Sequence, residues 1–168
     1  MPKLYVITGP AGVGKSTISK RLAEISSKSA LIEGDDIYHQ VITSYAPAWK
    51  QGNHLKIFWE ICINIIKIYL NNNYDVIFNY IVTPENLELI KNEFNMFDIK
   101  FVVLLVDEST LLLMDNQRDK NYQMGDRCIV LLNNFRNRNY CQNNILDTSD
   151  LSIDETVKLI EFDDRFIL

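Results

Sequence analysis

The residues that decide the fold stand at the start of the chain, where positions 3–17 read K-L-Y-V-I-T-G-P-A-G-V-G-K-S-T. The first six form a mostly apolar run typical of a buried strand, and the residues from Lys15 onward have helical spacing. Between them, Gly9 to Gly14 forms a glycine-rich segment that permits left-handed backbone and close approach of other groups. We therefore predict a strand, a tight turn and a helix in direct succession.

The turn matches the pattern G-x-x-x-x-G-K-[ST] of a phosphate-binding loop, the Walker A motif. Its backbone N–H groups are expected to face phosphate oxygens, with Lys15 reaching the β- and γ-phosphates and Ser16 binding Mg²⁺. Thr17 falls in the first helical turn, near the positive end of the helix dipole. The nucleotide-binding residues predicted from this motif are Gly9, Pro10, Ala11, Gly12, Val13, Gly14, Lys15, Ser16 and Thr17.

The rest of the chain alternates apolar strands with helices. Further strands are predicted at 29–33, 75–80, 99–106 and 144–147, and helices at about 15–27, 55–70, 84–94, from 108, at 126–138 and at 152–161. Continuous apolar strands are typical of a parallel sheet covered on both faces. We predict a single α/β domain over residues 1–168, with a five-stranded parallel sheet. The helix at 55–70 is expected to be deeply packed apart from one polar stripe, formed by Lys56, Glu60, Asn64 and Lys67.

Composition limits the choice of partners. The net charge of −5 argues against nucleic acid as the main partner, because a phosphate backbone requires a basic surface. No apolar run reaches the ~20 residues that a membrane span needs, and no secretory leader is evident, so no membrane partner is expected. Three widely spaced cysteines favour a reducing cytoplasm over a disulfide framework or a zinc site. A monomer and a homodimer both remain open.

Two other nucleotide-binding classes are disfavoured. The D-x-x-G and N-K-x-D elements of GTPases are absent from the sequence. Residues 103–108, V-L-L-V-D-E, look like the Walker B strand of an ATPase motor, but such motor domains are usually larger. We favour the interpretation that Asp107 ends a buried strand and caps the following helix.

The carboxylate favoured for chemistry is Asp35, in the E-G-D-D segment at 33–36. The carboxyl ends of neighbouring parallel strands share one crevice, so the loops after Thr8 and Glu33 are expected to face the same site. A carboxylate there can accept a proton from an attacking hydroxyl or hold a metal-bound water. For Asp36, a functional role and a solvated turn residue are equally compatible with the pattern.

With these motifs the chain resembles the small P-loop kinases, a group that includes shikimate kinase, gluconate kinase and chloramphenicol phosphotransferase. The resemblance covers nearly the whole chain and is strongest to bacterial proteins described as gluconate kinases. It is carried by residues 4–17, by I-E-G-D-D-I-Y-H at 32–39, by Arg118 with M-G-D-R at 124–127, and by L-D-T-S at 146–149.

The resemblance implies ATP with Mg²⁺ as the phosphoryl donor and a hinged lid at about residues 114–126. It implies that Asp35 is the base or a ligand of substrate or metal, and that Thr148 lies near the adenine. Arg118 would close over the γ-phosphate together with Lys120 or Arg127. Two positions depart from the family pattern: Met114 stands where relatives often carry arginine, and Asn79 ends the third strand where an acidic residue is common.

The class of phosphoryl acceptor is predicted from the absence of arginine in the region expected to line its pocket. No arginine occurs between Leu22 and Gln117, and a phosphate-bearing acceptor calls for bidentate arginine clamps. This disfavours a nucleoside monophosphate kinase and favours a hydroxylated small molecule such as a sugar acid, a polyol or an antibiotic-like compound. The predicted substrate-binding residues are Asp35, Asp36, His39, Asn79 and Tyr80, with Tyr38, Tyr45, Trp49, Lys50, His54, Lys56 and Trp59 as further candidates.

The sequence therefore predicts an enzyme that uses Lys15, Asp35 and Arg118 to transfer a phosphoryl group from ATP to a small-molecule hydroxyl. Three alternatives stay open. The departures at Met114 and Asn79 motivate a non-catalytic, ATP-binding regulatory protein. A nucleoside or nucleotide kinase is the second, and a polynucleotide end kinase, disfavoured by the acidic balance, is the third.

Overall fold

A computed structural model of the chain describes residues 1–42 and 53–168, apart from the side chain of Tyr122. The strands are β1 (Lys3–Thr8), β2 (Ser29–Glu33), β3 (Asp75–Asn79), β4 (Asp98–Leu105) and β5 (Ile145–Asp147). The α-helices are α1 (Lys15–Ile25), α2 (Gly34–Tyr38), α3 (Asn53–Asn71), α4 (Pro84–Glu93), α5 (Glu108–Asn116), α6 (Asp126–Arg136) and α7 (Ile153–Phe162). Short 3₁₀ turns are η1 (Lys120–Tyr122), η2 (Gln142–Asn144) and η3 (Asp164–Phe166).

The described strands form one five-stranded sheet in the order β2-β3-β1-β4-β5, and every pairing is parallel. This confirms the predicted α/β fold. The register aligns Glu33 of β2 with Asn79 of β3, and Asn79 with Ile7 of β1. The carboxyl ends of three adjacent strands therefore meet at one edge, beside the glycine-rich turn that follows Thr8.

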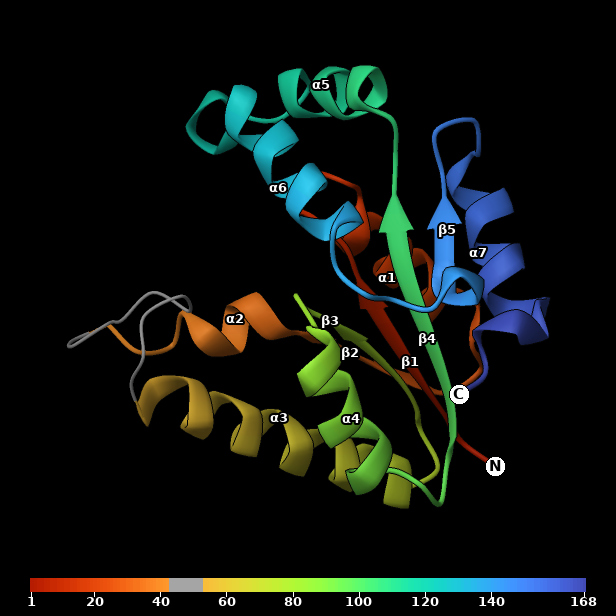
Figure 1. The fold of residues 1–168 in the computed structure, drawn as a ribbon. Helices are drawn as coiled ribbons and strands as arrows, with labels where there is room; N and C mark the ends of the chain where they lie inside the picture. Colours follow the sequence, from red (N-terminus) through yellow and green to blue (C-terminus); the bar gives the residue numbers. More distant parts are fainter. Residues whose placement is uncertain (43–52) are drawn as a thin grey trace.

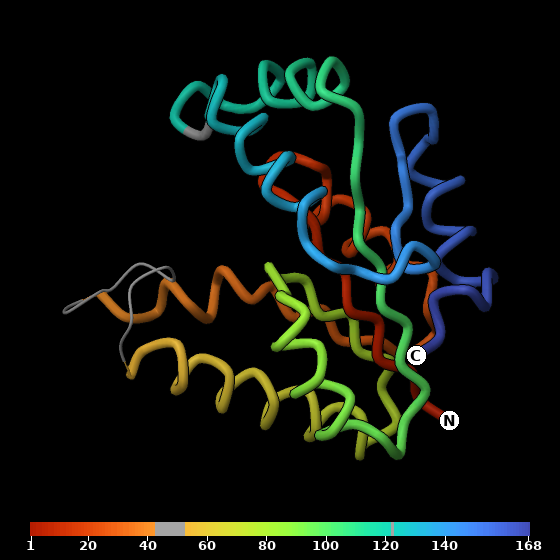
Figure 2. Tube along the Cα trace, viewed as in Figure 1, coloured from red at the N-terminus to blue at the C-terminus, as the bar shows by residue number. Residues whose placement is uncertain are grey.

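Helices cover both faces of the sheet, as Figures 1 and 2 show. On one face, Phe58, Cys62 and Ile66 of α3 pack with the strand residues Leu4 and Val6. On the other face, α1 and α7 pack together against side chains that include Tyr5 and Ile7. Helices α5 and α6 contact each other beyond the carboxyl end of β4, while both chain termini lie at the opposite end of the sheet (Figure 1).

Local sequence signals explain several helix ends. A capping box is present at α7, where Ser152 and Glu155 exchange side-chain to backbone hydrogen bonds. The predicted cap of α5 is also present, since the Asp107 side chain accepts from the Thr110 backbone N–H at 2.8 Å. The short helix α2 stands where a loop after Glu33 was expected.

The prediction that α3 is deeply packed except along its polar stripe is wrong. Phe58, Cys62, Ile66 and Leu70 are buried, but Ile57 and Ile68 expose 48% and 60% of their surface. A helix that lies on one face of a sheet has only one side covered, and no other described element covers the outer side of α3. None of the helices in the described ranges combines the length and the apolar character that crossing a membrane requires.

Candidate active site

The glycine-rich loop has the backbone that its sequence predicts. Gly12 and Gly14 have φ values of 90° and 88°, in the left-handed region that favours glycine. At Gly9 a Cβ atom would lie 2.4 Å from the Leu104 carbonyl oxygen, so a side chain there would collide with β4. Helix α1 begins directly after this loop, at Lys15. The first N–H groups of a helix have no partner within the helix, so they are available to bind an anion.

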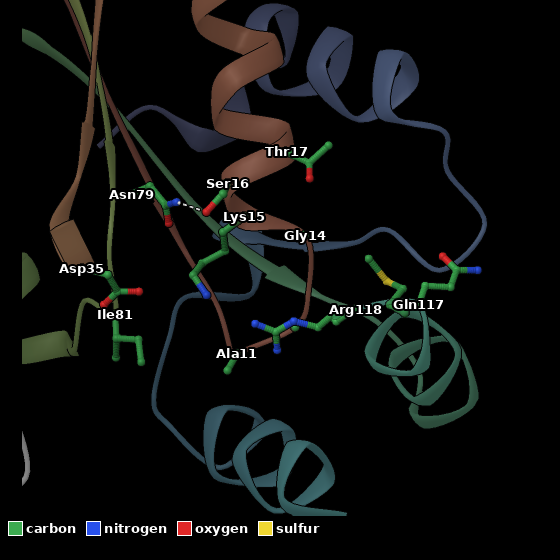
Figure 3. A pocket seen from close by; sticks show the side chains of 12 residues that line it. Ala11, Gly14, Lys15, Ser16, Thr17, Asp35, Asn79, Ile81, Gln117 and Arg118 are labelled. Carbon is green, nitrogen blue, oxygen red and sulfur yellow. Dashed lines mark hydrogen bonds between the residues drawn. The ribbon is translucent and has the colours of Figure 1, made fainter. Parts of the chain in front are cut away.

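A cavity of about 440 Å³ opens in front of the loop and collects most of the predicted site residues. It is lined by Ala11, Gly12, Gly14, Lys15, Ser16, Thr17, Asp35, Asn79, Ile81, Met114, Gln117 and Arg118. Figure 3 shows Asp35 and Arg118 on opposite sides of the Lys15 ammonium. The three residues predicted to carry the chemistry thus come from α1, α2 and the segment after α5, and they face one space.

The Lys15 ammonium is in an unusual electrostatic environment. Burial is the main cause that lowers its pKa, to about 8, and the charge of Arg118 lowers it further, while Asp35 and Glu33 act in the opposite direction. The ammonium donates a hydrogen bond to the Pro10 carbonyl oxygen at 2.9 Å. Negatively charged phosphate oxygens in the cavity would stabilise its protonated form.

Glu33 belongs to this site although the sequence reasoning did not select it. The Ser16 hydroxyl donates to Glu33 Oε2 at 3.3 Å, and the Asn79 amide donates to Ser16 Oγ at 3.1 Å and to the same Glu33 oxygen. Burial raises the pKa of Glu33, and the hydrogen bonds from Ser16 and Asn79 oppose that rise. The available signal was its position as the last residue of a strand whose neighbour ends at Asn79.

These side chains suit a hard cation such as Mg²⁺, which prefers oxygen ligands and is commonly bound by one or two carboxylates plus substrate phosphates. The Ser16 hydroxyl and the Glu33 carboxylate offer oxygen atoms that can coordinate a metal ion beside the phosphate loop. Asn79 Oδ1 is buried and has no hydrogen-bond partner among the described residues, so an acceptor oxygen is also available there. No group of three or more His, Cys, Asp or Glu side chains gathers around a metal position within residues 1–42 and 53–168.

Asp36, His39 and Tyr80, all predicted to bind substrate, do not line this cavity. Asp35, Asp36 and His39 are all exposed, but of these three only Asp35 lines the cavity, because successive helix residues point about 100° apart. Tyr80 is buried, with its ring centroid 4.4 Å from that of Phe58. A Cβ atom at Gly34 would lie 2.6 Å from the Tyr80 ring, which explains glycine at the start of α2. Tyr45, Trp49 and Lys50 lie outside the described residues.

Thr148 lines a second cavity of about 280 Å³ that adjoins the first. The two cavities share Gly14, Thr17 and Met114, and none of the described residues that line the second one is charged. A Cβ atom at Gly14 would lie 3.2 Å from Met114 Cε, so this methionine sits against the phosphate loop. An uncharged slot next to the loop is suited to a nucleobase, and the placement of Thr148 near the adenine stays a prediction.

The segment that carries Arg118 is folded around the Asp115 carboxylate, which is 1% exposed. It accepts hydrogen bonds from the backbone N–H groups of Met124 and Gly125, each at 2.8 Å, and pairs with Arg118 at 3.5 Å. These hydrogen bonds outweigh the effect of burial, and the pKa of Asp115 is lowered. Lys120 and Arg127 do not line the cavity.

The sheet order, the glycine-rich loop and the residues around it define the P-loop kinase fold. No protein-family model matches the chain, and no curated protein matches its sequence. Solved structures of this fold superpose on it over nearly its full length.

Three such structures illustrate the likeness. The tunicamycin resistance protein of Deinococcus radiodurans has a TM-score of 0.71 and 16% identity, with 95% of this chain and 94% of that one covered. A gluconokinase from Sinorhizobium meliloti 1021 has a TM-score of 0.69 and 16% identity, with 95% and 89% covered. The APS kinase CysC of Mycobacterium tuberculosis, in complex with AMPPNP and APS, has a TM-score of 0.68 and 15% identity, with 95% of both chains covered. At these identities the likeness shows the fold.

Proposed function

We propose that this protein is an ATP-dependent kinase that transfers the γ-phosphoryl group to a hydroxyl of a small molecule. The observation that carries this proposal is the convergence of Lys15, Asp35 and Arg118 on one cavity in front of the phosphate loop. The fold it shares with a gluconokinase and with an APS kinase bound to an ATP analogue supports the same reaction class.

The residues of the cavity divide the work of phosphoryl transfer. The loop N–H groups and the Lys15 ammonium hold the phosphates and offset the charge that develops on the transferred group. Asp35 accepts the proton of the acceptor hydroxyl. The hydroxyl oxygen forms a bond to the γ-phosphorus while the bond between the γ-phosphorus and the ADP oxygen breaks. Mg²⁺ bound beside Ser16 and Glu33 would supply positive charge to the β- and γ-oxygens.

Arg118 supplies a second positive charge from the side of the cavity that faces Asp35 (Figure 3). Its segment, residues 114–126, is the proposed lid, and its folding around Asp115 presents the guanidinium toward the phosphate loop. Closure of this segment over the nucleotide would exclude water and so limit hydrolysis of ATP.

The acceptor is proposed to be an uncharged hydroxyl compound. Among the described residues that line the cavity, the charged side chains are Lys15, Asp35 and Arg118, and both cations are assigned to the donor phosphates. No further cation is left in the described lining to clamp an acceptor phosphate. Ile81 and Asn79 add an apolar and a polar surface next to Asp35, which is suited to a polyol or to the hydroxyl of a larger natural product.

The test is ADP release from Mg-ATP with a panel of polyols, sugar acids, nucleosides, and aminoglycoside and phenicol antibiotics. The Lys15→Ala variant serves as the blank for contaminating ATPases. Release that depends on an acceptor and is absent from the blank supports a kinase and identifies the substrate class. If no compound of the panel causes ADP release while Mg-ATP still raises the melting temperature, the result favours the non-catalytic ATP-binding alternative.

A further inference from the structure

We propose that the protein carries a second ligand site at the opposite end of the sheet, which binds a small molecule with a primary ammonium group on a short alkyl arm. A cavity of about 320 Å³ lies where α1 and α7 end and β3 begins. It is lined by Tyr5, Leu22, Ile25, Ser26, Ser27, Asp75 and Glu161, and we call it the amino-end cavity. None of these residues lines the cavity in front of the phosphate loop.

Two carboxylates of the amino-end cavity give it a negative lining. Asp75 is held in place, because its oxygens accept from the Lys3 backbone N–H at 2.8 Å and from the Ser26 hydroxyl at 2.9 Å. Each of its oxygens retains a further acceptor position. The Glu161 side chain has neither a hydrogen bond nor an ion pair with any described residue.

No described cation neutralises these carboxylates inside the cavity. Lys, Arg and His are absent from its described lining. The neighbouring Lys100 ammonium lies outside the lining and donates to the carbonyl oxygens of Ile160, Glu161 and Asp163 at 3.2, 2.8 and 3.1 Å. Its charge acts on the Glu161 carboxylate, but it forms no ion pair with Glu161 or Asp75. The negative lining is therefore open to a positively charged ligand.

Tyr5 provides an independent indication of a ligand. The residue is only 6% exposed and lines the cavity, yet its hydroxyl makes no hydrogen bond within the part of the chain that the structure describes. The oxygen is not among the enclosed polar atoms that lack a partner, so it opens to the cavity, where a ligand atom can reach it. Burial raises the pKa of this phenol to about 12, with contributions from the charges of Asp75 and Glu161, so the hydroxyl keeps its proton and a neutral oxygen acceptor.

The acceptors around the cavity match the donors of an alkylammonium ion. An ammonium group has three N–H donors, and the carboxylates of Asp75 and Glu161 and the oxygen of Tyr5 are available to accept them. Leu22 and Ile25 supply apolar surface for the attached methylene groups. An anion would be repelled by both carboxylates, and an uncharged alcohol would leave their charge without compensation.

The experiment is a titration of the full chain with n-butylamine, followed by backbone amide NMR shifts at constant ionic strength and pH 7. Butan-1-ol is the uncharged control of the same chain length. We expect saturable shifts at Tyr5, Leu22, Ile25 and Ser26 with the amine, and none with the alcohol. Glu161→Gln and Tyr5→Phe remove one acceptor charge and one hydroxyl with little change in shape, and each is expected to weaken binding at least about fivefold.

Two further variants complete the design. Glu60→Gln removes an exposed carboxylate outside the cavity and is expected to leave the affinity for n-butylamine unchanged. Lys15→Ala is also expected to leave it unchanged, which separates this site from the proposed kinase function. The proposal is overturned if the shifts do not saturate up to roughly 20 mM amine. It is equally overturned if butan-1-ol produces the same shifts, or if Glu161→Gln and Tyr5→Phe bind as the natural protein does.

Discussion

The side-chain amide of Asn79 donates a hydrogen bond to the Ser16 hydroxyl over 3.1 Å, although the two residues are 63 positions apart in the sequence. The contact joins the end of β3 to the first turn of α1, and the same amide also donates to Glu33. The phosphate loop is therefore connected through one neutral side chain to the end of β2, which carries the half-buried carboxylate of Glu33.

Replacing Asn79 with aspartate tests this connection. In Asn79→Asp a carboxylate takes the place of the amide that donates to Glu33, and two like charges at hydrogen-bond distance repel each other. We expect a lower melting temperature at pH 7 without Mg²⁺, and a larger rise on adding Mg²⁺ than the natural protein shows. Differential scanning fluorimetry with and without Mg²⁺ measures both. Equal melting temperatures in the absence of metal would contradict the described contact.

The Glu33→Gln variant is expected to change stability and activity in opposite directions. The raised pKa means that the folded chain binds the Glu33 proton more tightly than the unfolded chain, so stability of the metal-free protein falls as pH rises upward from the ordinary value of 4.5. Glu33→Gln removes this dependence and is expected to raise the melting temperature at pH 7. It is also expected to lower acceptor-dependent turnover by roughly 10- to 100-fold, through loss of the carboxylate beside Ser16.

The matched control is Asp36→Asn, which removes an exposed carboxylate three positions away that does not line the cavity. This variant is expected to keep the turnover and to raise the melting temperature only slightly, because the Asp36 charge makes a smaller contribution to the raised pKa of Glu33 than burial does. A Glu33→Gln variant that behaves like Asp36→Asn in both measurements would exclude a role for Glu33 in the site.

Lys15 makes ATP affinity dependent on pH. Because its pKa is lowered to about 8, the ammonium of the nucleotide-free protein loses its proton above that pH. We expect the Kd for Mg-ATP, measured by calorimetry, to rise above pH 8 by up to about tenfold per pH unit. Lys15→Arg, which stays charged throughout, is expected to show no such rise.

The stability of the nucleotide-free protein is expected to change in the opposite direction. The folded-state pKa lies below the ordinary 10.5, so the contribution of Lys15 to stability increases as pH rises from about 8 toward 10.5.

The affinity measurement can contradict this description of Lys15. A Kd for Mg-ATP that stays constant from pH 7 to roughly pH 9.5 would show that the ammonium is not desolvated as the structure describes.

Asp107→Ala tests the interpretation of the V-L-L-V-D-E segment. Asp107 accepts hydrogen bonds from Ser109 and Thr110 at the start of α5, and these lower its pKa. Loss of this cap is expected to lower the unfolding free energy measured in urea at pH 7. The difference should shrink as pH falls below the usual aspartate value of 3.8 toward the lowered pKa, because the unfolded chain binds the proton first and the folded carboxylate only at lower pH.

Turnover in Asp107→Ala is expected to stay within about threefold of that of the natural protein, since the side chain does not line the cavity. A Walker B role would instead require a large loss of turnover with little change in stability. Asp107→Ser, which keeps a capping oxygen, is expected to recover most of the lost stability.

The sequence predicted the features that depend on local chemistry. The glycine pattern before Lys15 specifies the phosphate loop, and Ser152 with Glu155 specifies the start of α7. The buried strands read as continuous apolar runs, from which the parallel sheet followed. Asp35 could be selected because parallel strands end at one edge.

The features that were missed depend on tertiary packing. Whether Glu33 or Asp36 faces the phosphate loop depends on the strand register and on the rotation of α2, which the sequence pattern alone does not specify. Which cations of the segment around Asp115 reach the cavity also depends on tertiary contacts, and Lys120 and Arg127 do not line it. The exposed side of α3 could not be predicted from apolar spacing, because that spacing does not reveal which neighbouring element covers a helix.

The most direct test of the central claim compares Asp35→Asn with Asp36→Asn in phosphoryl transfer from γ-labelled ATP to an acceptor that gives ADP release in the panel. The account predicts that Asp35→Asn lowers kcat by at least about 100-fold while the Kd for Mg-ATP changes little, and that Asp36→Asn transfers label normally. Transfer by Asp35→Asn at the rate of the natural protein would contradict the assignment of Asp35 as the base.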